Sequence, residues 1–373
     1  MKPSTANRNS AWVTYGTDYQ DMAMRILTAA DVASRIPFKN ARIALKPNLV
    51  LAAHASQGAT THPELVAGAI EYLQANGFHN LTIVEGAWAG GRTQKAFEVC
   101  GYQALRKRYG VELLDTQQDK SHTVNCAGFP LNLCACATSF DYLINFPVLK
   151  GHCQTTITCA LKNLKGLIPD SEKRRFHTMG LMKPIAHLST AIRQDFVLVD
   201  AICGDLDFEE GGNPVQRNQV FGFLDPVLCD AYACEMLGYV VADVPYIGMA
   251  EKLGVGSADT AILRMTALGQ PSPIKEEEAK PPSRRVQALA RYIDAMDACS
   301  ACYANLIHAL KRLDEEGQLR RLSGKVCIGQ GYKGSKGEFG VGACTAGFDC
   351  TVAGCPPTAT AMYKVLAERC GVK

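Results

Sequence analysis

The feature that most constrains this chain is the concentration of cysteine and glycine in its last fifth. Seven of the sixteen cysteines lie after residue 298. Two of them form the motif Cys299-Ser-Ala-Cys302, and Cys344 and Cys355 follow beyond the glycine-rich run GQGYKGSKGEFGVG over residues 329–342. So much glycine predicts an irregular loop whose backbone can pass close to a bulky group. Thiolates at such spacings are typical of a metal or iron–sulfur site.

We therefore predict that Cys299, Cys302, Cys344 and Cys355 hold a [4Fe–4S] cluster. Cys350 is the alternate ligand for one of the last two positions. Zinc is the alternative metal, because a single CxxC without a second one does not distinguish the two.

The remaining cysteines are interpreted as small buried hydrophobes. This applies to most of the nine that precede residue 299, and to Cys327 and Cys370. Cys327 stands between apolar neighbours, as a residue of a buried strand would.

The composition narrows the class of protein. A chain of 373 residues predicts two or three packed units. The formal charge of +3, without a long basic run, argues against nucleic acid as a partner. There is neither an apolar stretch near the start nor a run of about 18 apolar residues, so we expect a cytoplasmic protein without a membrane partner. Sixteen cysteines then indicate free or metal-bound thiols and not disulfides.

Before residue 270, short β-rich runs alternate with helical periods, which predicts an α/β fold made of a layered sheet with flanking helices. Strands are expected at residues 12–15, 41–46, 81–85, 111–115, 141–146 and 196–201. Helices are expected at residues 21–35, 63–76, from 93, 184–194, 225–237, 245–253 and 358–369.

Residues 269–285, GQPSPIKEEEAKPPSRR, break this pattern with four prolines and a charge run. The chain is thus divided into an α/β body of one or two lobes over residues 1–270, a linker over 271–285, and a small cysteine-bearing C-terminal domain over 286–373. Apolar residues from Val286 to Met296 predict a helical face that leads into the CxxC.

A second constellation lies at the expected strand ends of the body. NFPVLKGH over residues 145–152 delivers Lys150 and His152, and LKNLKG over residues 161–166 adds Lys162, Asn163 and Lys165. Open α/β sheets bind ligands at the carboxyl ends of their strands. Several ammonium and amide groups there predict a small anionic ligand, a carboxylate or a phosphate.

Roles within this constellation follow from the residue types. His152 and Lys150 are the candidate catalytic residues, although His152 could also be a metal ligand or a core histidine. Lys46 and Asn48 of KPN and Glu85 join the ligand-binding set. The run from Lys173 to Arg175 is interpreted as a solvated basic surface.

At these residues the chain resembles the DUF362 family, a domain of unknown function common in anaerobic bacteria and archaea. The matching segments are KPNLV from Lys46, TTHPELVAGAIEYL from Thr60, VEGAWAGG from Val84, NFPVLKGH from Asn145, ALKNLKGLIP from Ala160 and DPVLCDAYACEMLG from Asp225. The resemblance implies iron–sulfur ligands, but this chain lacks the repeated CxxCxxCxxxCP run of many members. A distant similarity of the family to the lactate racemase fold implies a small hydroxyacid or another carboxylate.

Together these observations predict a cytoplasmic iron–sulfur protein, a redox enzyme whose cluster lies near the anion-binding loop and exchanges electrons with a partner protein. Two alternatives stay open. One is a non-redox lyase or isomerase of hydroxyacids with structural zinc, and the other is a non-catalytic electron carrier.

Overall fold

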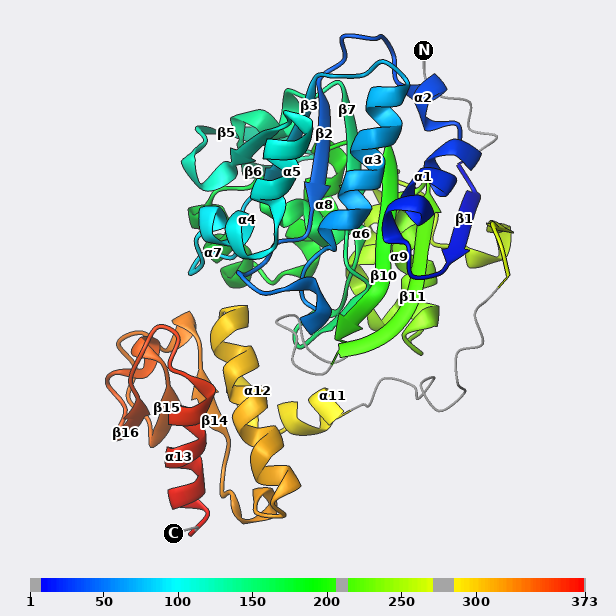
Figure 1. Cartoon of the computed structure of the whole chain (residues 1–373). Helices are drawn as coiled ribbons and strands as arrows, with labels where there is room; N and C mark the ends of the chain where they lie inside the picture. Colours follow the sequence, from blue (N-terminus) through cyan, green and yellow to red (C-terminus); the bar gives the residue numbers. More distant parts are fainter. Residues whose placement is uncertain (1–7, 206–213, 271–284, 372–373) are drawn as a thin grey trace. The chain divides into compact units, whose positions relative to one another are not determined.

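The structure, a computed structural model, describes residues 8–205, 214–270 and 285–371 (Figure 1). Two compact units are distinguished. The body comprises residues 1–173 and 182–281, and the C-terminal unit comprises residues 174–181 and 282–373. The linker expected over 271–285 lies outside the described residues except for its last position.

The body is built on one eight-stranded sheet in the order β12-β1-β11-β10-β7-β2-β3-β4. Its strands are β1 (Ser10–Tyr15), β2 (Ile43–Pro47), β3 (Leu81–Glu85), β4 (Glu112–Asp115), β7 (Tyr142–Phe146), β10 (Phe196–Asp205), β11 (Pro214–Phe223) and β12 (Arg264–Ala267). The neighbours from β10 to β4 are parallel, whereas β11 is antiparallel to both β10 and β1. Strand order reverses between β2 and β7, because β3 and β4 extend the sheet on one side of β2 and β7 on the other.

Two hairpins stand outside this sheet: β5 (Ser121–Cys126) with β6 (Phe129–Cys134), and β8 (Lys150–His152) with β9 (Thr156–Thr158). The helices of the body are α1 (Tyr19–Ala29), α2 (Val32–Arg35), α3 (Pro63–Ala75), α4 (Thr93–Val99), α5 (Tyr102–Tyr109), α6 (Ala160–Asn163), α7 (Asp170–Thr178), α8 (Met182–Ala191), α9 (Pro226–Met236) and α10 (Pro245–Lys252). The C-terminal half of α7 is grouped with the C-terminal unit.

The main core lies between the sheet and helices α1 and α3. Ile43 and Leu45 of β2 pack there with Ile26 of α1 and Ile70 of α3. Successive strand residues point to opposite faces, so Lys46 projects from the other side of β2. That alternation directs the apolar side chains to one layer and a lysine to the layer that carries the candidate site.

The C-terminal unit contains a parallel sheet in the order β13-β14-β15-β16. Its strands are β13 (Ile293–Ala295), β14 (Val326–Ile328), β15 (Phe339–Val341) and β16 (Cys350–Val352), and its helices are α11 (Arg285–Ala290), α12 (Ser300–Glu315) and α13 (Ala359–Arg369). Helices α12 and α13 pack against each other (Figure 1). Each strand has three residues, so all four carboxyl ends lie along one short edge.

The fold class is confirmed, but three local predictions are wrong. The helix expected over residues 21–35 is divided into α1 and α2, because Asp31 adopts a left-handed backbone with φ of 48°. The helical face expected up to Met296 ends at Ala290, since the following residues pair with β14 as strand β13. The glycine-rich run is not wholly irregular, since it contains β15.

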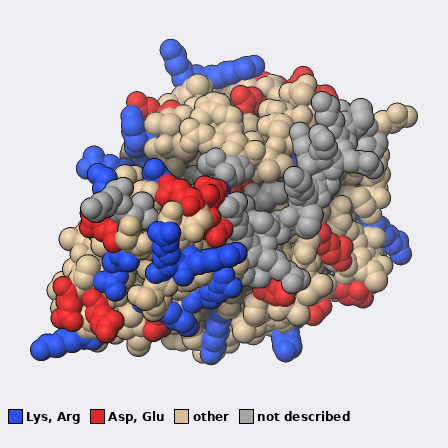
Figure 2. Space-filling view, turned by 90° about the horizontal axis from the view of Figure 1, so that it is seen from below, with Lys and Arg blue, Asp and Glu red and all other residues tan. Residues whose placement is uncertain are grey.

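Acidic and basic side chains both occur on the face shown in Figure 2, in agreement with the small net charge of +3. Among the described helices, none combines the length and the apolar character needed to cross a membrane.

Candidate metal centre and strand-end site

Each predicted cysteine ligand follows an element of the small parallel sheet. Cys299 comes shortly after β13 and is the N-cap residue of α12, whose first turn carries Cys302. Cys344 lies in the short helix η11 (Ala343–Thr345) after β15, and Cys355 follows β16. Parallel strands present their carboxyl ends at the same edge. The sheet therefore brings together thiols that are far apart in the sequence.

The four thiols line one pocket. Its lining residues are Cys299, Cys302, Gly329, Gln330, Val341, Gly342, Ala343, Cys344, Gly354, Cys355 and Pro356. The turns after β14, β15 and β16 all contribute, and the pocket has an empty volume of about 290 Å³, open solvent included. Cys302 is buried, Cys299 and Cys344 are half-buried, and Cys355 is exposed. The pocket thus has a closed end at α12 and an open end at Cys355.

Glycine residues allow the backbone of these turns to pass close to the cysteine sulfurs. Gly342 has φ of +91°, a conformation that L side chains rarely adopt, and a Cβ on it would lie 3.2 Å from the Sγ atom of Cys302. Gly329 and Gly354, at the corresponding turns, also have positive φ values, of 122° and 137°. The backbone itself therefore forms the wall of the pocket.

The thiols also act on one another electrostatically. A hydrogen bond from the Cys302 thiol stabilises the Cys299 thiolate and lowers the pKa of Cys299 to about 6, despite partial burial. The same bond, with burial and the sulfurs of Cys344 and Cys355, raises the pKa of Cys302. These shifts show that the four sulfurs share one local environment.

Cys299 and Cys302 interact as a pair, but the pocket sulfurs are not closely gathered as a set of three or more. Among the described residues, the pocket cysteines do not form a group in which three ligand atoms all lie within 4.8 Å of one another. Around one zinc ion, with Zn–S of about 2.3 Å and tetrahedral angles, neighbouring sulfurs stand about 3.8 Å apart.

Cysteines outside the pocket are placed differently. Cys350 begins β16, where it pairs with Phe339, and it is absent from the pocket lining. Cys327 is half-buried in the middle of β14, and Cys370 is buried. Of the nine cysteines in the body, all except the half-buried Cys153 are buried.

In the body, the predicted strand-end residues meet where the strand order reverses. The Nζ atom of Lys46 lies 2.5 Å from a carboxylate oxygen of Glu85, and both side chains are almost fully buried. Burial lowers the pKa of Lys46, and Glu85 acts against that shift. The Glu85 carboxylate also accepts from the backbone N–H of Leu49 and Gly86. Lys46 and Glu85 therefore neutralise each other inside the protein.

Amide side chains extend this network. The amide of Asn163 donates to the side chain of Asn145 over 2.7 Å, and Asn145 donates to the carbonyl of Ala160. The buried Lys150 ammonium donates to the carbonyl of Ala59 over 2.6 Å and lies 3.4 Å from Asn48 Oδ1. Asn163, Asn145 and Lys150 therefore have hydrogen-bond partners within the protein.

His152 and Lys162 lie close to these groups in sequence and structure. His152 ends β8, and its Nδ1 atom accepts from the backbone N–H groups of Gln154 and Thr155, at 3.0 and 3.1 Å. An acceptor nitrogen carries no proton, so the neutral ring is the tautomer protonated at Nε2. Lys162, in α6, is buried and lies 3.3 Å from Thr158 Oγ1, and Lys165 is half-buried.

The run from Lys173 to Arg175 is not uniformly solvated. Arg174 and Arg175 are exposed, but Lys173 is buried and donates to the carbonyls of Gly86 and Ala87. The prediction was wrong for Lys173, because successive side chains of a helix point in directions about 100° apart, so one can be buried while the next two are exposed.

One pair escaped the sequence analysis. Both the backbone N–H and the Nδ1 atom of His62 lie within hydrogen-bond distance of Asp200 Oδ2, at 2.7 and 2.9 Å. Burial lowers the pKa of His62, but the Asp200 carboxylate overcomes this and the net shift is upward. His62 directly precedes the helix expected over residues 63–76, and Asp200 lies in the strand expected over residues 196–201. The spacing of 138 residues gives no local signal.

Two known proteins are similar to parts of this chain. The chain is 26% identical to a thylakoid-associated protein of Synechocystis sp. over 225 residues, which are 57% of this chain and 68% of that relative. A structural match to the lactate racemase apoprotein from Thermoanaerobacterium thermosaccharolyticum has a TM-score of 0.39 and 14% identity. It covers 63% of this chain and 58% of the racemase chain.

The family model for the domain of unknown function DUF362 matches residues 43–235, just over half of the chain, and this range contains the strand-end residues from Lys46 to Lys165. The chain belongs to the DUF362 family.

Proposed function

We propose that this protein is an iron–sulfur protein, a redox enzyme that acts on a small anionic ligand. Its C-terminal unit would hold a [4Fe–4S] cluster on Cys299, Cys302, Cys344 and Cys355. The observation that carries this proposal is that these four thiols line one pocket. When bound, such a cluster supplies one-electron transfer.

Apart from the interacting pair Cys299 and Cys302, the spacing of the sulfurs favours a cluster over zinc. In a [4Fe–4S] cluster each thiolate binds a different iron atom, so the sulfurs lie further apart than the about 3.8 Å required around one zinc ion. A group of pocket cysteines within 4.8 Å would suit zinc, and the described residues of the pocket do not form one. The glycines of the three turns leave room for a bulky inorganic core.

The exposure of the ligands suggests how electrons would reach the cluster. Cys302, in the first turn of α12, is buried, whereas Cys355 is exposed. An electron-transfer partner protein would therefore approach at the Cys355 end of the pocket.

The anionic ligand is assigned to the strand-end site of the body. Lys162 and Lys150 are cations at the carboxyl edge of the sheet, and His152 would move a proton through its Nε2 atom. Lys46 is less suited to contact a ligand, since Glu85 already neutralises it. Asn48, Asn163 and Lys165 would complete the polar lining.

The cluster is tested on full-length protein prepared and reconstituted anaerobically. We expect about four irons and four sulfides per chain and a low-temperature EPR signal after reduction with dithionite. Cys302→Ser should lose most of the iron. Cys350→Ser, in the same small sheet but outside the pocket, is the matched control and should keep it. A colourless protein whose zinc is lost in Cys302→Ser would establish the zinc alternative instead.

The anion site is tested separately, by calorimetric titration with lactate and with inorganic phosphate. Lys162→Ala should weaken binding at least tenfold while the iron content stays that of the wild type. Binding that is unchanged in Lys162→Ala and in His152→Gln would remove the anion-site assignment and leave the cluster assignment intact.

A further inference from the structure

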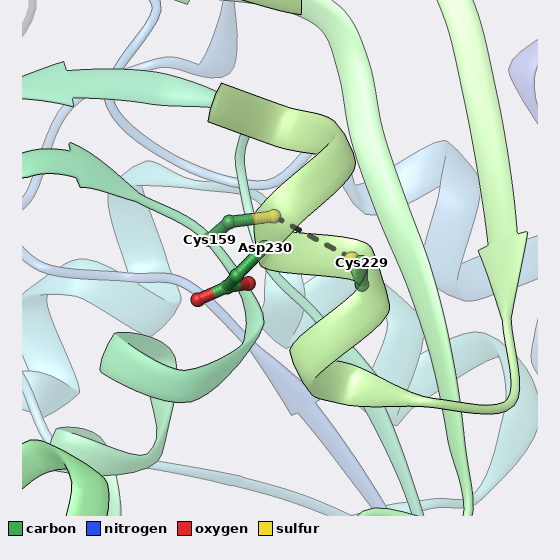
Figure 3. Close-up of side chains that lie close together, drawn as sticks. All are labelled: Cys159, Cys229 and Asp230. Carbon is green, nitrogen blue, oxygen red and sulfur yellow. Dashed lines mark hydrogen bonds between the residues drawn. The ribbon is translucent and has the colours of Figure 1, made fainter. Parts of the chain in front are cut away.

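A second group of metal-ligand atoms lies deep in the body, unrelated to the pocket cysteines. The Sγ atoms of Cys159 and Cys229 and a carboxylate oxygen of Asp230 all lie within 4.8 Å of one another (Figure 3). All three residues are fully buried or nearly so. The inference drawn from this group is independent of the function proposed above.

Two elements distant in the sequence bring these residues together. Cys159 directly follows β9 and precedes α6, whereas Cys229 and Asp230 lie in α9. The start of α9 is held by Asp225, whose carboxylate accepts from the backbone N–H groups of Val227 and Leu228. Figure 3 shows the two sulfurs facing each other with the Asp230 carboxyl group beside them.

The separation of the sulfurs suits one small ion. Cys159 Sγ and Cys229 Sγ are 3.8 Å apart. Two thiolates on a tetrahedral zinc ion stand at about the same separation, for a Zn–S bond of about 2.3 Å. A thiol–thiol hydrogen bond has this length as well, so the distance permits both and the experiment must separate them.

The carboxylate keeps capacity for a metal. One oxygen of Asp230 accepts from the backbone N–H of Ala160 over 2.6 Å, and the other accepts from that of Leu161 over 3.2 Å. Each carboxylate oxygen has two lone pairs. Besides the backbone donors, the carboxyl group accepts from the Cys159 thiol and the Tyr246 hydroxyl. Loss of the Cys159 proton on metal binding would free a lone pair for the ion. The two backbone hydrogen bonds hold the group in place and leave it able to ligate.

The donors around the carboxyl group carry no charge. The hydrogen bonds to this carboxyl group come from backbone N–H groups, the Cys159 thiol and the Tyr246 hydroxyl, which are uncharged donors. Three acidic groups in so small a buried volume must either all hold their protons or share a positive ion.

We propose that Cys159, Cys229 and Asp230 bind one divalent, thiol-preferring cation, with zinc as the first candidate. The two thiols would lose their protons on binding, because thiolates are the ligands. Water or the nearby Tyr246 hydroxyl would take the fourth position.

Such an ion would have a positioning role for the strand-end site. It would join the start of α6 to α9, and α6 carries Lys162 and Asn163. The KNLKG segment would then be held in two ways. The metal would bind Cys159 directly before α6, and Asn163 donates hydrogen bonds to the ends of β2 and β7.

The test uses the full-length protein and two alanine variants of helix α9. Cys229→Ala removes a ligand, and Cys234→Ala, a buried cysteine of the same helix outside the group, is the matched control. After incubation with zinc and desalting, we expect wild type and Cys234→Ala to keep about one more zinc per chain than Cys229→Ala. Iron content should be equal in all three, which separates this site from the pocket.

Cobalt provides a second readout that reports ligand type. Co²⁺ added to wild type or Cys234→Ala should give thiolate-to-cobalt charge-transfer absorption that is at least halved in Cys229→Ala. Cys159→Ser should behave like Cys229→Ala, which guards against misfolding of a single variant. If zinc retention and the cobalt spectrum are the same in wild type, Cys229→Ala and Cys234→Ala, the three side chains are a hydrogen-bonded buried cluster and the proposal is wrong.

Discussion

Both units of this protein place polar chemistry at the carboxyl ends of parallel strands, but their side chains find partners in different ways. In the body, Lys46 pairs with Glu85, Asn163 with Asn145, and His62 with Asp200. In the C-terminal unit, the groups that meet are four thiols of one kind.

This difference in partners indicates whether the side chains at each sheet edge need a bound cation. Complementary groups satisfy one another when they are buried, so these three pairs of the body stabilise the fold without a ligand. A set of like acids gains nothing by being gathered unless a cation joins it. The following predictions test this contrast, from the largest expected change to the smallest.

The largest change is expected on breaking the buried ion pair. Glu85→Ala leaves the Lys46 ammonium buried without its partner, which should lower the free energy of unfolding by about 3–5 kcal/mol. Both tryptophans of the chain, Trp12 and Trp88, lie in the body, so denaturant unfolding followed by tryptophan fluorescence reports on this unit.

The matched control for this variant is the double replacement Lys46→Met with Glu85→Leu, which removes both charges and keeps apolar volume. The double variant should lose less free energy of unfolding than Glu85→Ala does alone. A loss below about 1 kcal/mol in Glu85→Ala would contradict the view that the body site depends on internal pairing.

A smaller change is expected from crowding the same pair. A Cβ on Gly166 would overlap the Glu85 carboxylate and lie 2.6 Å from Lys46 Nζ. Gly166→Ala should therefore destabilise the body by about 1–3 kcal/mol in the same fluorescence assay. Gly248→Ala in α10 is the control, since its Cβ would meet nothing within 4 Å and alanine favours a helix. Equal stability of the two variants would show that the pair can move aside.

The pair of His62 and Asp200 predicts a pH dependence. The pKa of His62 is raised in the folded protein, so its stabilising effect is complete below the unfolded value of about 6.5 and is lost as pH rises through the folded value. The difference in unfolding free energy between wild type and His62→Gln should shrink as the pH rises above about 6.5, by at most about 1.4 kcal/mol per pH unit. The difference in unfolding free energy between wild type and Asp200→Asn should shrink with rising pH in the same way. If either difference did not depend on pH, the His62–Asp200 pair would not be the cause of the pH dependence.

The smallest change in folding is expected at the pocket. Cys344 is half-buried, so Cys344→Ser should alter the stability of the metal-free C-terminal unit by less than about 0.5 kcal/mol. Hydrogen exchange of the α13 amides measures this. The same variant should lose most of its iron after reconstitution, unlike Cys350→Ser. Unfolding of metal-free Cys344→Ser would mean that the thiol is a packing residue.

The sequence predicted elements well where a local period was strong. Strand β3 and helix α3 were placed within one residue, because β-branched runs and a Pro–Gly bracketed apolar period leave few alternatives. Strand β13 was mistaken for helix, since its three residues follow an apolar helical period and owe their conformation to pairing with β14. Strands this short are decided by their neighbours.

For the candidate sites, the residue types carried more information than the spacing. CxxC together with a glycine-rich run was enough to nominate the four thiols. Burial could not be inferred in the same way. The same reasoning treated Lys46 as a ligand contact and Lys173 as a surface residue, yet both are buried against groups from other parts of the chain. The sequence shows that a residue is a lysine, but it does not show which distant acceptor the ammonium group will contact.

The sequence by itself determined the α/β class and the family membership of residues 43–235, and it supplied the candidate side chains. Only the tertiary structure decided which of them meet. It joined Cys302 to Cys344 through a parallel sheet, Cys159 to Cys229 through two separate elements, and His62 to Asp200 across 138 residues. The physical reason is that residue type and period act within a few turns of chain, whereas a site depends on distances between strand ends and helices that only the packed layers fix.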